Sequence, residues 1–176
     1  MVLEERTIKS DKIYTGKILT LRVDTVEIDG QGYSKREIVE HGGAVGILAI
    51  TDDKKVVLVK QYRKAVEKPL IEIPAGKLEI GENPKECALR ELKEETGYDA
   101  ENIKLIHKFY SSAGFSNEQL FLYLATGLTE GETNLDDDEF IDVSLVDLEE
   151  AYDMVLNNNI EDSKTTIAIL MAKNCL

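Results

Sequence analysis

Residues 76–98 have the sequence GKLEIGENPKECALRELKEETGY, and this stretch decides the fold prediction. It predicts one helix with two well-defined ends. Asn83 is suited to the N-cap, and Pro84 is suited to the first helical position, where its missing N–H needs no partner. Gly97 is suited to the position just past the helix, where a left-handed backbone is common. The sequence therefore predicts a helix over residues 84–96.

Three glutamates lie on one arc of this predicted helix, beside its apolar arc. Glu91, Glu94 and Glu95 are spaced i, i+3 and i+4, so their carboxylates are neighbours that repel one another. Partial burial beside the core adds to that cost. A divalent cation among them would remove the conflict, and an all-oxygen ligand set favours Mg²⁺, Mn²⁺ or Ca²⁺ over zinc. For the helix taken alone, the alternative is a solvated acidic face balanced by Arg90 and Lys93.

The longer pattern around these glutamates resembles the Nudix box. That family has glycine, glutamate, Arg-Glu, an apolar residue, Glu-Glu, glycine and a final apolar residue at fixed spacing. Every position matches, with Tyr98 as an aromatic variant of the last. The resemblance implies metal binding by Ala75, Glu91, Glu94 and Glu95, with Mg²⁺ as the cofactor and Mn²⁺ as an alternative. It also implies that Arg90 orients a glutamate, that Glu82 lies close to the metal, and that Gly76 lets the loop turn.

The same resemblance implies a pyrophosphohydrolase. Divalent cations would hold a diphosphate and lower the pKa of a bound water, which attacks one phosphorus. Residues 136–140, DDDEF, are similar to the acidic loop of ADP-ribose pyrophosphatases, in which the glutamate before the aromatic residue acts as a base or a metal ligand. Glu139 holds that position here, so the predicted catalytic residues are Glu139, Glu94 and Arg90. A solvated acidic loop is the alternative for this segment.

Four further segments resemble the ADP-ribose pyrophosphatase branch of the family. They are REIVEHGGAVGILAI (36–50), VVLVKQYRKAVEKPLIEIPAGKLE (56–79), GFSNE (114–118) and IEDSKTTIAILMA (160–172). The resemblance implies that ADP-ribose is hydrolysed to AMP and ribose 5-phosphate. The residues that it assigns to substrate binding are Arg36, Arg63, Glu72, Glu82, Gly114 and Phe115.

One position departs from that branch. The branch commonly has proline before the Gly-Phe pair, whereas this chain has Ala113, which lacks the fixed φ of proline. Another nucleotide sugar or a nucleoside triphosphate therefore stays an alternative substrate. A non-catalytic ligand-sensing module built on the same fold is a third hypothesis, although its usual mark is a broken box and this box is intact.

The pattern of elements predicts a mixed α/β fold with a single Nudix domain over residues 1–176. The expected architecture is an α/β/α sandwich with a mixed sheet and an N-terminal antiparallel strand region. The predicted strands are 17–28, 34–41, 70–74, 102–110 and 118–126, and residues 43–50 are predicted to form a hairpin with 56–63. Helices are predicted at about 146–157 and 163–174, the second capped by Asp162 or Ser163. In the resembling branch, strands like residues 1–40 often exchange between subunits, which implies a homodimer.

Composition narrows the range of partners. The net charge is −13, with 34 acidic against 21 basic residues, so a nucleic-acid partner held by clustered Lys and Arg is not expected. No apolar run approaches about 18 residues, so no membrane span is expected. The first twelve residues, MVLEERTIKSDK, contain no apolar signal segment, and Cys87 and Cys175 are expected to be reduced thiols. We therefore expect a cytoplasmic enzyme with a small nucleoside diphosphate substrate.

Overall fold

The structure is a computed structural model that describes residues 4–134 and 140–175, with side chains described up to residue 173. The chain forms two compact units. Unit 1 comprises the residues up to Gly43 together with Tyr110–Gln119, and unit 2 comprises Ala44–Phe109 with the residues from Leu120 onward. One domain over residues 1–176 stays a prediction.

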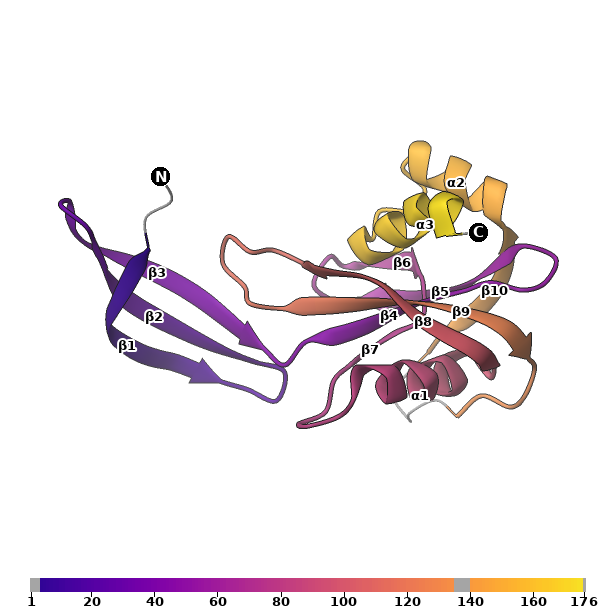
Figure 1. Ribbon diagram of the computed structural model, residues 1–176, viewed down its shortest axis with the longest axis horizontal. Coiled ribbons are helices and arrows are strands. Elements are labelled where there is room, and N and C mark those ends of the chain that lie inside the picture. The colour runs from indigo at the N-terminus through magenta and orange to yellow at the C-terminus, as the bar shows by residue number, and fades with distance from the viewer. Residues whose placement is uncertain (1–3, 135–139, 176) are drawn as a thin grey trace. The chain divides into compact units, whose positions relative to one another are not determined.

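Unit 1 is built on an antiparallel sheet with the order β1-β2-β3 (Figure 1). Its strands are β1 (Glu5–Thr15), β2 (Leu19–Ile28) and β3 (Gly32–His41). The predicted N-terminal antiparallel region is therefore confirmed, but the sequence did not predict β1. Ile8 and Ile13 are five positions apart and break the alternation of a simple strand, and register shifts between Thr7 and Lys9 and between Lys12 and Tyr14 interrupt the pairing.

Unit 2 contains two sheets and all three helices of the described residues. The mixed sheet has the order β7-β4-β9-β8, with β4 antiparallel to β7 and parallel to β9. The second sheet has the order β10-β5-β6 and is antiparallel. The elements are β4 (Ala44–Ala49), β5 (Lys55–Arg63), β6 (Lys68–Glu72), β7 (Ala75–Lys77), α1 (Pro84–Thr96), β8 (Asp99–Tyr110), β9 (Gln119–Thr129), β10 (Asp142–Asp147), α2 (Leu148–Leu156) and α3 (Ser163–Cys175).

The predicted hairpin of residues 43–50 with 56–63 is wrong, because β4 and β5 enter different sheets. They stay together only at the turn, where Ile50 and Val56 form an isolated bridge. Both strands are apolar on both faces, as expected for strands covered on two sides. Such a run does not specify a partner strand, and here the partners come from later in the chain.

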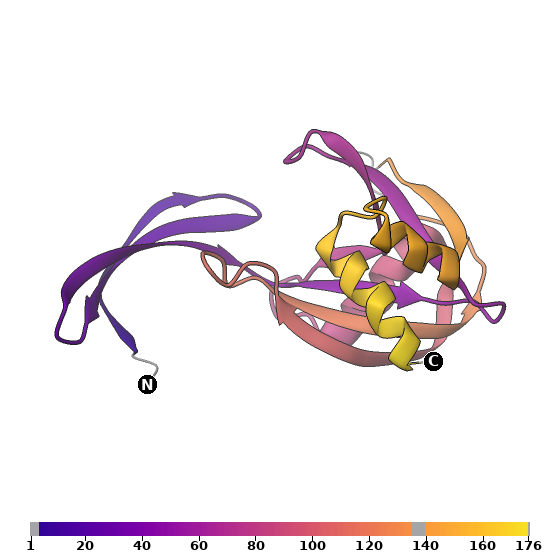
Figure 2. The same cartoon turned by 90° about the horizontal axis from the view of Figure 1, so that it is seen from above.

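Helices cover both sides of these sheets (Figures 1 and 2). Val45 and Ile47 of β4 belong to the core cluster that includes Ala88 and Leu92 of α1. Leu48, on the opposite face of β4, belongs to the cluster that includes residues of α2 and α3. Side chains that alternate between the two faces of β4 therefore pack into two separate core layers. The predicted α/β/α sandwich with a mixed sheet is confirmed.

The helix ends follow local sequence closely. Asn83 accepts a hydrogen bond from the Lys85 N–H at 2.9 Å, and Gly97 has a φ of +77°, as predicted for the ends of α1. Asp162 accepts from the Thr165 N–H at 3.0 Å, so it is the residue that caps α3. The helix predicted over 146–157 begins only at Leu148, because β10 takes the residues before it. Within the described residues, no helix is long and apolar enough to cross a membrane.

Gly97→Ala should lower the free energy of unfolding more than Gly81→Ala. Both glycines have positive φ, +77° and +80°, so each alanine carries a left-handed backbone strain, about 1–2 kcal/mol. A Cβ at Gly97 would also lie 2.7 Å from the Gly131 carbonyl oxygen, whereas nothing lies within 4 Å at Gly81. Urea unfolding measures both losses. Equal losses would contradict the close approach of Gly131 to the end of α1.

Candidate active site

The acidic face of α1 lies against the short strand β7. Glu95 is 3% exposed, and its Oε2 accepts a hydrogen bond from the Ala75 N–H at 3.1 Å. Two of the predicted metal-binding residues are thus brought together. A carboxylate buried to this extent needs compensating partners, because burial penalises its charged form. The contact fixes the start of β7 to the last full turn of α1.

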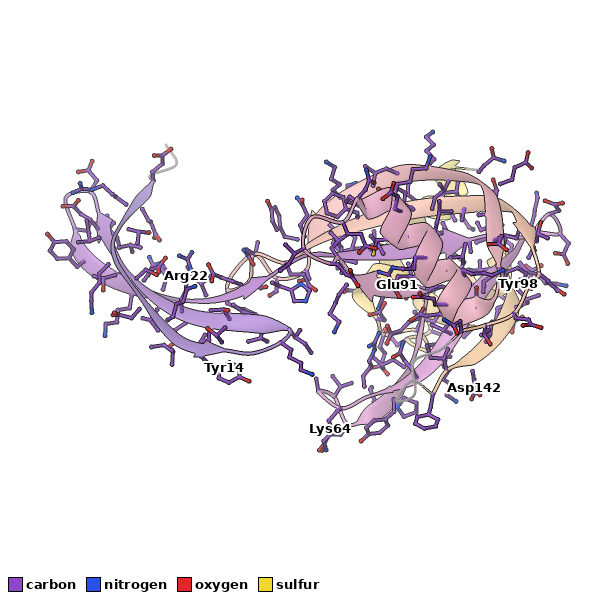
Figure 3. The ribbon with its side chains drawn as sticks, turned by 90° about the horizontal axis from the view of Figure 1, so that it is seen from below. Tyr14, Arg22, Lys64, Glu91, Tyr98 and Asp142 are labelled. Atoms are coloured by element: carbon purple, nitrogen blue, oxygen red, sulfur yellow. The ribbon has the colours of Figure 1, made fainter. Side chains whose placement is uncertain are left out.

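Gly76 makes room for a second glutamate of this face. A Cβ at Gly76 would lie 1.8 Å from the Glu91 Cδ, so only glycine allows the Glu91 carboxylate to pack on this backbone. Figure 3 labels Glu91 on α1. Gly76 does not have a positive φ, so the structure gives a steric reason for glycine here, and the predicted role of letting the loop turn stays a prediction. The spacing from Gly76 to Glu91 therefore follows from a steric requirement.

Arg90 links three carboxylates, one from Glu82 before α1 and two from Glu91 and Glu94 on the helix. Its Nη1 donates to Glu91 Oε1 at 2.9 Å and to Glu94 Oε2 at 2.8 Å. Its Nε and Nη2 donate to the two carboxylate oxygens of Glu82 at 3.0 and 3.3 Å. The hydrogen bonds with Glu82 are the largest cause of the raised pKa of Arg90 and of the lowered pKa of Glu82. One guanidinium thus offsets part of the repulsion that the sequence predicts among these groups.

Cys87 lies beside this arginine but is not suited to nucleophilic chemistry. The thiol is buried, and burial is the largest cause that raises its pKa to about 12. Only the thiolate is a good nucleophile, so Cys87 is essentially inert at neutral pH. The reactive groups of this face are therefore carboxylates and one guanidinium.

The donor set fits a hard divalent cation. Glu91, Glu94 and Glu95 with the Ala75 backbone supply only oxygen ligands, the type that Mg²⁺ and Mn²⁺ take. Among residues 4–134 and 140–175, no three acidic, histidine or cysteine side chains already form a metal-binding group. Arg90 instead holds two of the three glutamates. The face is thus chemically matched to a cation, and the arginine keeps the carboxylates in place.

A second charged pair lies at the ends of β5 and β6. Arg63 donates from Nε and Nη2 to the two oxygens of Glu72, both at 2.6 Å, which is a bidentate pair. The Glu72 side chain is 1% exposed and also contacts Lys164. Burial alone would raise the pKa of Glu72, but the hydrogen bond from Arg63 and the charge of Lys164 bring it below the ordinary value.

Arg63 connects this pair to the acidic face of α1. Its pKa is raised first by the hydrogen bond to Glu72, against the opposing effect of burial, and the charge of Glu95 adds to the rise. Of the predicted metal ligands, Glu95 thus lies within electrostatic reach of Arg63. Two predicted substrate-binding residues, Arg63 and Glu72, come together, and Glu72 lies three residues before Ala75 of the predicted metal site.

Three other predicted substrate-binding residues belong to unit 1. Arg36 of β3 pairs with Glu5 of β1, with 2.8 Å from Nε to Oε2. Gly114 and Phe115 lie on the loop that follows β8, and the Phe115 carbonyl accepts from the Val39 N–H at 2.8 Å. Their roles stay predictions.

Glu139, predicted as the base, lies outside the described residues. The chain just before it is fixed to α1, because the Asn134 N–H donates to the Glu94 carbonyl at 3.0 Å.

The sequence prediction missed Lys164. Residues 160–172 resemble the ADP-ribose pyrophosphatase branch, but the resemblance implies no role for this lysine. The available signal was its position in the first turn of a helix, where a cation is disfavoured by the helix dipole unless an acidic group compensates it. The partner, Glu72, is 92 residues away in sequence and could not be identified without the fold.

Comparison with known proteins agrees with this geometry. The NUDIX domain family matches residues 40–168, which is most of the chain. The chain belongs to the Nudix family. It is 49% identical over 170 residues to a methanol dehydrogenase activator of Bacillus methanolicus, covering 96% of this chain and 92% of that protein. It is 48% identical over 169 residues to an ADP-ribose pyrophosphatase of Bacillus subtilis (strain 168), covering 95% and 91%.

The fold has a close match among solved structures. The crystal structure of an ADP compounds hydrolase superposes with a TM-score of 0.87 at 20% identity, covering 98% of this chain and 94% of that one. The predictions of a Nudix fold and of a Nudix hydrolase are confirmed. Nudix hydrolases generally need divalent metal ions, which agrees with the oxygen-rich face of α1. The non-catalytic alternative is not favoured.

Gly76→Ala should reduce the hydrolase activity about 100-fold, the scale on which a displacement of about 1 Å in an active site acts. The added Cβ would lie 1.8 Å from Glu91 Cδ, so the carboxylate has to move away. Steady-state kcat measures the effect, and circular dichroism checks that the fold is retained. Gly81→Ala is the control, because it lies in the same stretch with nothing within 4 Å of the new Cβ. Full activity of Gly76→Ala would mean that the position of Glu91 does not matter.

Proposed function

We propose that this Nudix hydrolase converts ADP-ribose to AMP and ribose 5-phosphate, with Mg²⁺ as the metal and Mn²⁺ as the alternative. One observation carries the proposal. Glu95, one of the carboxylates suited to a hard cation, lies within electrostatic reach of Arg63, a guanidinium suited to phosphate, and Arg63 is paired with Glu72, three residues before Ala75. A diphosphate bridged between a cation and an arginine fits this arrangement. The ADP-ribose pyrophosphatase of B. subtilis, 48% identical, supports the choice of substrate.

Arg63 is the residue that we assign to the phosphates. A guanidinium carries five N–H donors in a fixed plane. Glu72 takes two of them, and the bidentate geometry fixes the direction of the others. Arg63 is 39% exposed at its side chain, so solvent and ligands can reach it. We assign the substrate contacts to Arg36, Arg63, Glu72, Glu82, Gly114 and Phe115.

The acidic face of α1 is assigned to the metal through Ala75, Glu91, Glu94 and Glu95. When bound, Mg²⁺ offsets the charge of the diphosphate and lowers the pKa of a water molecule. Attack of this water on one phosphorus would break the bond to the bridging oxygen and release the other phosphate with that oxygen, and a carboxylate of this chain would accept the proton of the water. Arg90 keeps Glu91 and Glu94 oriented during this step.

Glu139 is the proposed acceptor of that proton. The Asn134 N–H is bonded to the Glu94 carbonyl, and Glu139 follows five residues later. Five residues span at most about 18 Å, so the segment starts close enough for its glutamate to serve the α1 site. This anchoring supports the assignment.

Glu95→Gln should lower kcat for ADP-ribose about a thousandfold, the scale seen when a key electrostatic group is lost. Glu139→Gln should also slow the reaction and change its pH profile. The control is Glu86→Gln, an exposed glutamate in the first turn of the same helix, which should keep wild-type turnover. The assay is a panel of ADP-ribose, other nucleotide sugars and nucleoside triphosphates with Mg²⁺ or Mn²⁺, with products identified. Turnover of another diphosphate without turnover of ADP-ribose would reject the proposed substrate.

A second candidate function is action on a dehydrogenase, as the name of the 49% identical relative from B. methanolicus suggests. The sequence alone did not raise this possibility. The Glu95→Gln variant separates the two candidates when it is added to purified methanol dehydrogenase. Activation that disappears together with hydrolysis would place both at the α1 site, and an unchanged dehydrogenase rate with wild-type protein would reject the second candidate.

We also propose a homodimer in the cytoplasm, with residues 1–40 contributing to the subunit contact. Among the described residues of unit 1, Val26 is the only buried side chain of the apolar core. Ile8, Ile13, Tyr14 and Tyr33 are instead between 49% and 70% exposed. A three-stranded sheet needs a covered apolar face for stability. A second copy of the chain would provide that cover.

Light scattering should therefore give the mass of a dimer, and Ile13→Glu should shift it toward the monomer. The Ile13 side chain is 60% exposed in one subunit, so a glutamate there is solvated in the monomer. Burial of its charge by a partner subunit would cost free energy and weaken the dimer. Lys9→Glu, at an exposed polar position of the same strand, is the control. A monomeric wild-type protein at micromolar concentration would contradict the proposal.

A further inference from the structure

A lysine in the first turn of α3 has its ammonium group buried against β6. The Lys164 side chain is 11% exposed. Burial and the positive end of the helix dipole both disfavour a cation at this place. The cost is offset by two carboxylates, since Nζ contacts Glu72 Oε2 and lies 3.1 Å from Asp162 Oδ1. Such an arrangement needs a reason beyond stability, because a buried ion pair is weak support for a fold by itself.

Lys164 and Arg63 bind the same carboxylate. Arg63 donates to both oxygens of Glu72 at 2.6 Å, and Lys164 donates to Oε2, so that oxygen is shared by the two cations. The terminal torsion of a glutamate is broad and weakly restricted. A second cation on one oxygen restricts this rotation. The orientation of the carboxylate in turn determines the plane of the bidentate guanidinium.

A side chain at the start of α3 is also hydrogen-bonded to the backbone of Ile73, the residue that follows β6. Thr165 Oγ1 accepts a hydrogen bond from the Ile73 N–H at 2.8 Å and donates to Asp162 Oδ2 at 2.6 Å. This attachment does not involve the Lys164 ammonium. Loss of the lysine head group therefore leaves α3 anchored next to Glu72. The role of Lys164 can thus be separated from the attachment of the helix.

We propose that Lys164 is a positioning residue, which holds Glu72 so that the guanidinium of Arg63 is fixed in the direction of the substrate phosphates. The proposal rests on the function proposed above, in which Arg63 binds the diphosphate. Lys164 itself contacts no substrate in this arrangement. It acts through Glu72 on Arg63, so its effect exists only while Arg63 is present.

Lys164→Met should raise KM for ADP-ribose about tenfold and change kcat less than about twofold, the pattern of lost substrate binding. Lys68→Met is the matched control. Lys68 forms an ion pair with Glu161 at 2.5 Å, but both side chains are about half exposed, at 45% and 52%. Exposed pairs contribute little, so this control should leave KM unchanged. Thermal unfolding of both variants measures any loss of stability separately from KM.

A double-mutant cycle with Arg63→Gln decides how Lys164 acts. If Lys164 works through Arg63, Lys164→Met adds no further change of KM in the Arg63→Gln background. A further tenfold rise in that background would mean an independent role and would overturn the proposal. If Lys164→Met fails to fold, Lys164→Gln, which keeps an N–H donor without the charge, takes its place in the cycle.

The outcomes also separate this inference from the proposed function. A raised KM in Arg63→Gln with a normal KM in Lys164→Met rejects the positioning role alone. A normal KM in Arg63→Gln rejects the phosphate contact of Arg63 and the positioning role with it. No turnover of ADP-ribose by the wild-type protein rejects the proposed substrate, and the cycle is then run with whichever diphosphate of the panel is hydrolysed.

Discussion

The site depends on the repulsion among three carboxylates on one side of α1. Glu91, Glu94 and Glu95 are neighbours on the helix, and Glu95 is almost fully buried. Arg90 offsets part of this repulsion by donating hydrogen bonds to Glu91 and Glu94, and the Ala75 N–H donates a hydrogen bond to Glu95. The remaining negative charge makes the face a strong attractor for a divalent cation. A net charge of −13 is therefore compatible with a phosphate substrate, because a cation bound at this face would reverse the sign of the local field.

Close packing of β7 on α1 fixes the geometry of this face. The Glu91 carboxylate lies where a Cβ of residue 76 would be, so glycine is required there for steric reasons. At the other end of the helix, Gly97 allows the chain to turn and lets the Gly131 carbonyl come close. Both glycines therefore bring backbone against α1, and the segment that begins at Gly131 leads to Asn134 and its bond with Glu94. The positions of Gly76 and Gly97 in the motif are therefore required by these contacts with α1.

Local features of the sequence were enough to predict the helix and its acidic face. Asn83 and Gly97 mark the two ends of α1 in the sequence, because helix capping involves neighbouring residues only. The partners of β4 and β5 could not be predicted, since a strand buried on both faces has no alternation to indicate them. The contact of Lys164 with Glu72 could not be predicted for a related reason. Its partner Glu72 is far away in sequence, and a lysine at a helix start indicates only that some acidic group must be near.

In the function proposed above, the two helical layers contribute opposite charges to one active site. The α1 layer would supply the carboxylates for a cation, whereas the α3 layer would supply Lys164, which contacts Glu72, the partner of Arg63. The strands between them carry the connection, because Glu72 ends β6 and Ala75 begins β7 only three residues later. A diphosphate needs both a cation and an oriented donor at a fixed separation. An α/β/α sandwich meets this requirement when one short strand connection is anchored to a helix on each side, through Glu95 on α1 and through Thr165 and Lys164 on α3.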